Sequence, residues 1–140
     1  MNKTTERVSV GWFLYDPETK KVLIHQRSDK DSGSPKEWDY FGGEGEVSET
    51  KEEALRREMC EELGIYPGRE RVEPLDDFPV EGGWHKYIFY IFPTRDEKKR
   101  MRLREGAGMG WFSFDDALKL NDLAPEVREK LQLLRKRIGD

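Results

Sequence analysis

The sequence contains little that would cross-link the chain or hold it in a membrane. Its one cysteine, Cys60, excludes an internal disulfide, and a lack of disulfides is typical of cytosolic rather than secreted proteins. No stretch approaches the ~20 consecutive apolar residues of a membrane-spanning helix. The N-terminal segment MNKTTERVSVGW also lacks the apolar core of a signal peptide. We therefore expect a cytoplasmic protein with no membrane partner.

The chain also lacks an excess of positive charge. Lys and Arg total 25 against 29 Asp and Glu, which gives a net charge of −4. General binding to nucleic acid depends on basic side chains that neutralise phosphates, so we do not expect it here. The densest basic run, residues 98–100, is predicted to lie in a solvated loop. A hydrophobic fraction of 35% in 140 residues supports one domain with its own core, residues 1–140.

Segments rich in β-branched and aromatic residues predict most of the strands. These segments are residues 7–15, 21–27, 38–41, 84–92 and 111–113. Pro17 favours a turn between the first two, which would make them a hairpin. Residues 70–81 are predicted to form an irregular strand or a loop. Three polar or glycine-rich segments are predicted to lack regular structure, namely residues 28–37, 94–104 and 105–110.

Capping residues mark the two main helices. Thr50 with Glu53 three residues later is typical of a capping box at a helix start, and Gly64 is typical of a helix end. A last helix is predicted to begin at Pro125, and Ser113 is a candidate cap for a short helix before it. Because strands and helices alternate irregularly, we expect an α+β fold in which helices cover both faces of a mixed sheet (α/β/α).

The first of these helices carries more carboxylate than a helix favours. Residues 44–62 contain eight glutamates and only three basic residues. Glu58, Glu61 and Glu62 are spaced at i, i+3 and i+4, so they share one helical face, and like charges at that spacing destabilise a helix. A hard divalent cation would neutralise them. An ordinary solvent-exposed acidic helix is the alternative, and in both cases we expect this face to point away from the core.

Two glycines directly before the helix favour the cation. We expect a glycine turn at Gly42 and Gly43, where the missing side chains let the backbone approach a ligand and expose its carbonyl groups. Magnesium takes oxygen ligands and is usually held by carboxylates together with substrate phosphates. The glycines and the glutamates together therefore indicate phosphate chemistry.

Residues 43–65 resemble the Nudix box. That pattern is a glycine, five residues, a glutamate, seven residues, Arg-Glu, an apolar residue, any residue, Glu-Glu, any residue, glycine and an aliphatic residue. Every fixed position is occupied, by Gly43, Glu49, Arg57, Glu58, Met59, Glu61, Glu62, Gly64 and Ile65. The order of strands, box and last helix is also similar to the family, so the resemblance extends to the whole chain and implies the Nudix fold.

The resemblance assigns roles to the residues of the box. It implies an enzyme that uses Mg²⁺ or Mn²⁺ to hydrolyse a pyrophosphate bond in a nucleoside diphosphate linked to a further group. Glu58, Glu61 and Glu62 match the metal-binding and catalytic glutamates, and Gly42 matches a residue whose carbonyl oxygen binds metal. Glu49 and Arg57 match a pair that holds the loop against the helix.

Two residues outside the box also match the family. Glu105 is similar to a glutamate that serves as a metal ligand or general base in the MutT-like branch; an ordinary loop carboxylate is the alternative. Arg27 matches a phosphate-binding position of that branch, with a surface arginine as the alternative. His25, His85 and Cys60 are interpreted as structural or surface residues.

The substrate depends on residues outside the box, and three hypotheses remain open. The first is a MutT-like pyrophosphohydrolase that acts on a nucleoside triphosphate. Pro125 stands where that branch reads oxidised guanine with an asparagine, which argues against that base. The second is an ADP-ribose or nucleotide-sugar pyrophosphatase, favoured by Pro79, 14 residues beyond Ile65. The third is a non-catalytic domain that only binds a nucleotide; the complete set of glutamates argues against it.

Overall fold

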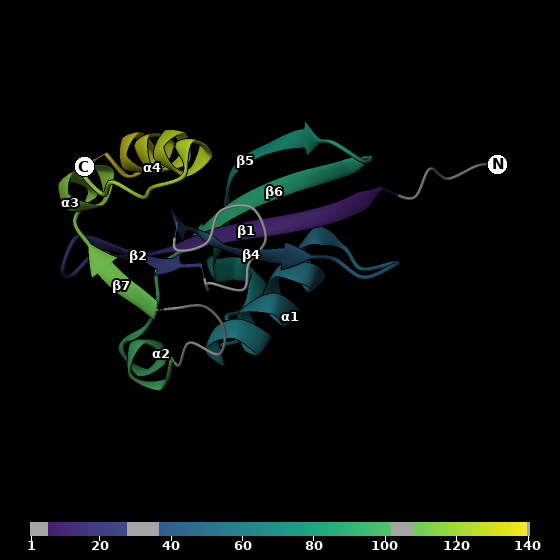
Figure 1. Cartoon of the computed structure of the whole chain (residues 1–140). Coiled ribbons are helices and arrows are strands. Elements are labelled where there is room, and N and C mark those ends of the chain that lie inside the picture. The colour runs from purple at the N-terminus through teal and green to yellow at the C-terminus, as the bar shows by residue number, and fades with distance from the viewer. Residues whose placement is uncertain (1–5, 28–36, 102–107, 140) are drawn as a thin grey trace.

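The described part of the chain forms seven strands, four α-helices and one 3₁₀ helix, arranged as Figure 1 shows. The computed structural model describes residues 6–27, 37–101 and 108–139. The elements in chain order are β1 (Arg7–Asp16), β2 (Lys21–Gln26), β3 (Trp38–Asp39), β4 (Phe41–Glu44), α1 (Lys51–Leu63), η1 (Arg69–Arg71), β5 (Val72–Val80), β6 (Trp84–Ile91), α2 (Arg95–Arg100), β7 (Gly108–Phe112), α3 (Phe114–Leu118) and α4 (Pro125–Ile138).

The strands form one mixed sheet around β1. Its main path runs β3-β2-β1-β6-β5, with β4 paired to β1 and β7 paired to β2. β1 runs parallel to β6 and antiparallel to both β2 and β4. Along the same side of β1, β4 pairs with Ser9 to Trp12 and β2 with Leu14 to Asp16. The sheet therefore divides there, which brings the β3–β4 segment between the two branches.

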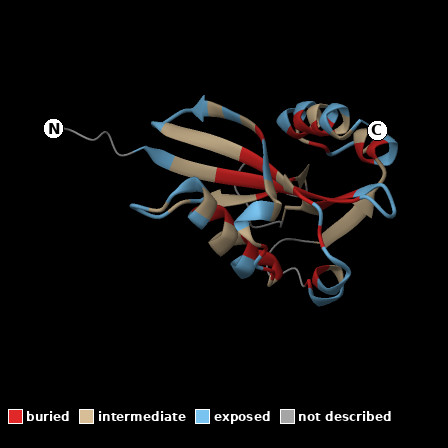
Figure 2. Cartoon of the chain, turned by 180° about the vertical axis from the view of Figure 1, so that it is seen from behind, coloured by how far each residue is buried: buried red, intermediate tan, exposed pale blue. Residues whose placement is uncertain are grey.

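Two buried apolar clusters lie on opposite faces of this sheet, as the predicted α/β/α arrangement requires. α1 covers one face with the stripe that contains Leu55, Met59 and Leu63. α3 and α4 cover the other face, where Leu131 and Leu134 are fully buried. The buried residues accordingly concentrate in the central strands and on the inner faces of the helices (Figure 2). No helix in the described ranges is long and apolar enough to cross a membrane.

The expected glycine turn before α1 is wrong. Gly42 and Gly43 lie in β4, paired with Gly11 and Val10 of β1. A Cβ at Gly42 would lie 2.6 Å from the carbonyl oxygen of Val10. Glycine is therefore present because two segments approach closely, and the turn follows at residues 47–48.

The charged segment after β6 is also more regular than expected. Residues 95–100 form α2, and Thr94 and Glu97 build a capping box at its start. Glu97 is buried and pairs with Arg71, 2.5 Å away. Lys98 contacts Asp16 at 2.9 Å. These ion pairs fix α2 against the end of β1 and against η1, so the basic run at 98–100 belongs to an anchored helix.

Candidate active site

Helix α1 begins and ends where the capping residues predict. The Thr50 hydroxyl accepts a hydrogen bond from the Glu53 backbone N–H at 3.1 Å, and the Glu53 carboxylate accepts one from the Thr50 N–H at 2.8 Å. Gly64 ends the helix in the left-handed conformation, with φ of 75°. These caps fix the register of the helix, and with it the face on which the box glutamates lie.

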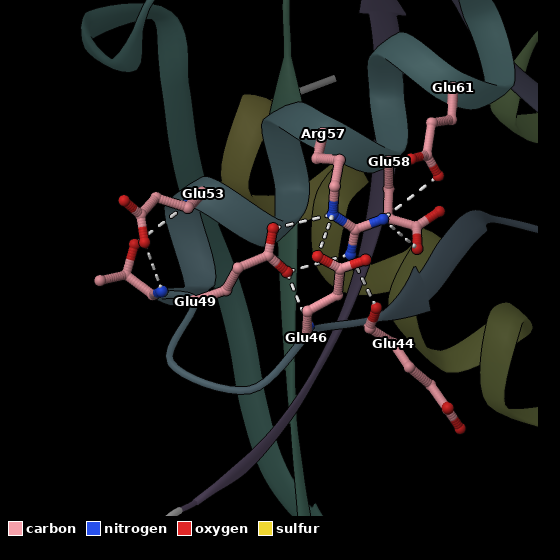
Figure 3. A network of polar contacts seen from close by, with 8 residues as sticks. Glu44, Glu46, Glu49, Glu53, Arg57, Glu58 and Glu61 are labelled. Atoms are coloured by element: carbon pink, nitrogen blue, oxygen red, sulfur yellow. Dashed lines mark hydrogen bonds and ion pairs between the residues drawn. The ribbon is translucent and has the colours of Figure 1, made fainter.

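Arg57 is the centre of the polar network on this helix (Figure 3). Its Nε and Nη2 donate to the two carboxylate oxygens of Glu49, at 2.8 and 3.0 Å. Nη2 also donates to the Glu44 carbonyl at 3.0 Å, which ties the end of β4 to the helix. The hydrogen bonds between them raise the pKa of Arg57 and lower the pKa of Glu49, so both side chains stay charged. The contact expected between Glu49 and Arg57 is therefore present.

The same guanidinium reaches two of the predicted metal ligands. Nη1 lies 3.4 Å from Glu58 and 3.2 Å from Glu61. A positive charge between these carboxylates lowers the repulsion that their spacing causes. Figure 3 shows both glutamates turned toward Arg57 from the same side of the helix.

Gly43 makes room for the carboxyl group of Glu58. A Cβ at position 43 would lie 2.5 Å from Glu58 Oε1 and closer still to the other carboxyl atoms. The Glu58 side chain is only 15% exposed, whereas that of Glu61 is 59% exposed. Glu58 is therefore held between β4 and Arg57, next to Gly42, whose backbone carbonyl is another predicted ligand.

We expected the whole glutamate face to point away from the core, and for Glu62 this is wrong. Glu62 is buried, with 8% of its surface exposed. It stands three residues after Met59 and next to Leu63, so the helical repeat brings it to the edge of the apolar stripe. Within the described ranges, no three acidic, His or Cys groups converge in a metal-binding arrangement.

The donor set nevertheless fits a hard divalent cation. Carboxylate oxygens and a backbone carbonyl are the ligands that Mg²⁺ and Mn²⁺ take. The space that Gly43 leaves is filled by a carboxylate instead of an apolar group. Glu58 and Glu62, both largely shielded from water, are carboxylates that a cation would neutralise.

The two predicted residues outside the box differ in what the structure says of them. Arg27 directly follows β2, and its backbone N–H donates to the Glu37 carbonyl at 2.9 Å. Burial raises the pKa of Asp39 on the neighbouring strand β3, and the positive charge of Arg27 acts against that rise. Glu105 lies outside the described residues, so its role stays a prediction.

A cluster near the start of α4 escaped the sequence analysis. Tyr40 donates its hydroxyl hydrogen to Glu126 of α4, and the ammonium of Lys86 lies 4.7 Å above the Tyr40 ring. Burial raises the pKa of Asp39 to about 6, in opposition to the nearby charge of Lys86. The only local signal is an acidic residue between two aromatic ones, Trp38 and Tyr40.

The histidines and the cysteine have structural or surface positions. The His25 ring stacks on Phe41 with centroids 4.7 Å apart, and its Nε2 lies 3.1 Å from the Tyr40 carbonyl oxygen. His85 Nε2 lies 2.8 Å from Asp77 on the neighbouring strand. Cys60 is exposed on α1.

Comparisons with known proteins identify the family of the domain. The profile of the NUDIX domain matches residues 5–134. A Caenorhabditis elegans protein with a nudix hydrolase name is 30% identical over 118 residues, or 84% of this chain. The chain spans 30% of the length of that curated relative.

Solved structures share the fold at low sequence identity. The MutT protein of Methanosarcina mazei Go1 has a TM-score of 0.70 and 20% identity, with all of both chains covered. The E. coli dihydroneopterin triphosphate pyrophosphohydrolase has a TM-score of 0.68 and 23% identity, covering 93% of this chain and 96% of that one. With the NUDIX domain profile matched over residues 5–134, this chain belongs to the Nudix family.

Proposed function

We propose that this protein is a divalent-cation-dependent pyrophosphohydrolase that acts on a nucleoside triphosphate and releases a nucleoside monophosphate and pyrophosphate. The observation that carries the proposal is the Glu58 carboxyl group, held between Gly43 of β4 and Arg57 of α1. Together with Glu61 and Glu62 it forms an acidic group on one helix that has the composition of a site for Mg²⁺ or Mn²⁺.

The chain's own residues divide the work between binding and support. Glu58, Glu61 and Glu62, with the Gly42 carbonyl, would hold the cation. When bound, a divalent cation neutralises phosphate oxygens and makes a water molecule more acidic. Arg57 and Glu49 hold the glutamates in place, as partners outside a metal's direct ligands commonly do.

The reaction transfers a nucleotidyl group to water. The water oxygen attacks the α-phosphorus, the P–O bond between that phosphorus and the oxygen bridging to the β-phosphorus breaks, and pyrophosphate leaves with the electron pair of that bond. The proton from water goes to a carboxylate, for which the box glutamates and Glu105 are the candidates. Arg27 would bind the substrate's phosphates.

The preference for a triphosphate rests on the MutT-like resemblance. A structural relative is named as a triphosphate pyrophosphohydrolase, although its similarity to this chain establishes the fold alone. The proposed cellular role is that of an enzyme on small-molecule nucleotides, and the proposed functional unit is residues 1–140.

A substrate screen with product masses tests this proposal. Purified protein with Mg²⁺ is incubated with canonical and oxidised nucleoside triphosphates, ADP-ribose, nucleotide sugars and dinucleoside polyphosphates. We expect nucleoside monophosphate and pyrophosphate from one or more triphosphates. Turnover of ADP-ribose or nucleotide sugars alone would replace the triphosphate with the second substrate class. Tight binding without turnover would indicate a binding domain and contradict the enzymatic proposal.

A further inference from the structure

Tyr40 connects three parts of the fold that are far apart in the sequence. Its side chain is 3% exposed and packs over β1, where a Cβ at Gly11 would lie 2.5 Å from Tyr40 Cε1. Its carbonyl oxygen contacts His25 of β2. Its hydroxyl group donates to Glu126 of α4, 86 residues later in the chain. Tyr40 is thus fixed by both branches of the sheet and by the last helix.

The backbone next to Tyr40 is fixed to the same part of the chain. The Trp38 N–H donates to the Asp122 carbonyl at 2.7 Å, and the Ala124 N–H donates back to the Trp38 carbonyl at 3.4 Å. The start of α4 is therefore bound to this segment by backbone contacts at Trp38 and by a side-chain contact at Tyr40.

Tyr40 directly precedes β4, and two residues later this strand reaches the candidate metal site. Gly42 carries the carbonyl proposed to bind the cation, and Gly43 leaves the space that Glu58 fills. Both glycines lie close to their neighbours, so a displacement of the strand would change the site. The position of Tyr40 at the start of β4 therefore sets the position of these two glycines against α1.

We infer that Tyr40 and Glu126 are positioning residues for the metal site, which act through the Gly42–Gly43 backbone. This inference rests on the proposed function, because it needs a cation at Glu58, Glu61 and Glu62. The hydroxyl–carboxylate contact holds the start of β4, and with it the Gly42 carbonyl and the space for the Glu58 carboxyl, which would together bind the cation. Neither residue touches the cation or the substrate in this account.

The affinity for Mn²⁺ without nucleotide, measured by electron paramagnetic resonance, tests the inference. Tyr40→Phe removes the hydroxyl group and keeps the ring over Gly11. We expect Mn²⁺ to bind about tenfold more weakly, as is typical when a partner outside the direct ligands is lost. Glu126→Ala should give the same loss from the helix side, whereas Glu126→Gln, which can still accept the hydrogen bond, should restore most of the affinity.

Tyr87→Phe is the matched control. The Tyr87 hydroxyl also donates to a glutamate, Glu6, at 2.6 Å, but Tyr87 lies on β6. We expect this variant to bind Mn²⁺ as the wild type does. Wild-type affinity in both Tyr40→Phe and Glu126→Ala would overturn the inference alone, even if both variants were less stable to urea. Absence of Mn²⁺ binding by the wild-type protein would overturn the proposed metal site and this inference together.

Discussion

The carboxyl group of Glu58 occupies the space in which any residue larger than glycine at position 43 would place its Cβ. The two residues come from different elements, β4 and α1, and Arg57 contacts the same carboxyl group at 3.4 Å. This relationship explains in physical terms why the strand before the helix needs glycine at position 43. It also makes the site sensitive to a single methyl group.

Gly43→Ala is therefore expected to damage the site without unfolding the protein. The added methyl group displaces Glu58, and we expect kcat/KM with Mg²⁺ to fall by roughly 10–100-fold, the range for disturbed metal surroundings. Steady-state kinetics and circular dichroism measure the two effects. Gly108→Ala is the control, since a Cβ at Gly108 meets nothing within 4 Å among the residues that the structure describes. Equal activity of the two variants would mean that Glu58 does not need this space.

Arg57→Lys tests the fork that holds Glu49. Lysine keeps the positive charge but cannot donate two parallel hydrogen bonds to one carboxylate. We expect activity to fall by roughly tenfold or more, with a loss of unfolding free energy of about 1 kcal/mol or less because the pair is partly exposed. The comparison is Arg95→Lys on α2, which alters a similar pair between Arg95 and Glu18 of the turn after β1. Comparable activity losses in both variants would contradict a specific role for Arg57.

Asp39 should make the stability of the fold depend on pH. Burial raises its pKa from 3.8 to about 6. A carboxyl group with a raised folded-state pKa contributes stability below its unfolded pKa, and that contribution is lost as the pH rises through about 6. We therefore expect Asp39→Asn to be more stable than wild type at about pH 7.5. The unfolding free energy, measured by urea denaturation, should be higher by about 1–3 kcal/mol. The difference should vanish near pH 4, and a variant that is less stable at about pH 7.5 would contradict the raised pKa.

The contribution of Asp76 to stability should depend on pH in the opposite direction. Its carboxylate lies 2.6 Å from Nζ of the buried Lys130, and this hydrogen bond lowers the pKa of Asp76. A lowered pKa contributes stability above the unfolded value of 3.8, and the contribution is lost as the pH falls through the folded-state pKa. We expect Asp76→Asn to lose about 1–2 kcal/mol of unfolding free energy at neutral pH, and less in acid. The same urea series measures it, and a gain in stability at neutral pH would contradict the pairing with Lys130.

Local signals were sufficient for the helices that carry clear caps. Helix α1 is capped by Thr50 and Glu53 at its start and by Gly64 at its end, as predicted, and α4 starts at Pro125. The short helix α2 was missed although Thr94 and Glu97 repeat the same capping box, because its charged composition favoured a loop. The layered α/β/α arrangement followed from the order of strands and helices.

The features that the sequence did not reveal depend on distant contacts. Gly42 and Gly43 read locally as a turn, but β1, more than thirty residues earlier, pairs with them as a strand. The contact between Tyr40 and Glu126 joins residues 86 positions apart and leaves no periodic trace. The burial of Glu62 differs in kind, because its spacing from Met59 already places it beside the apolar stripe.

The most direct test of the metal site is the Mg²⁺-dependent release of pyrophosphate by wild type and by Glu62→Gln. The substitution keeps the shape of a buried side chain and removes its charge. We expect turnover to fall by about 100-fold or more, because loss of a partner outside the direct metal ligands already costs up to about 100-fold. The circular dichroism spectrum should be unchanged. Unchanged turnover by Glu62→Gln in a folded protein would contradict the assignment of the site to this helix.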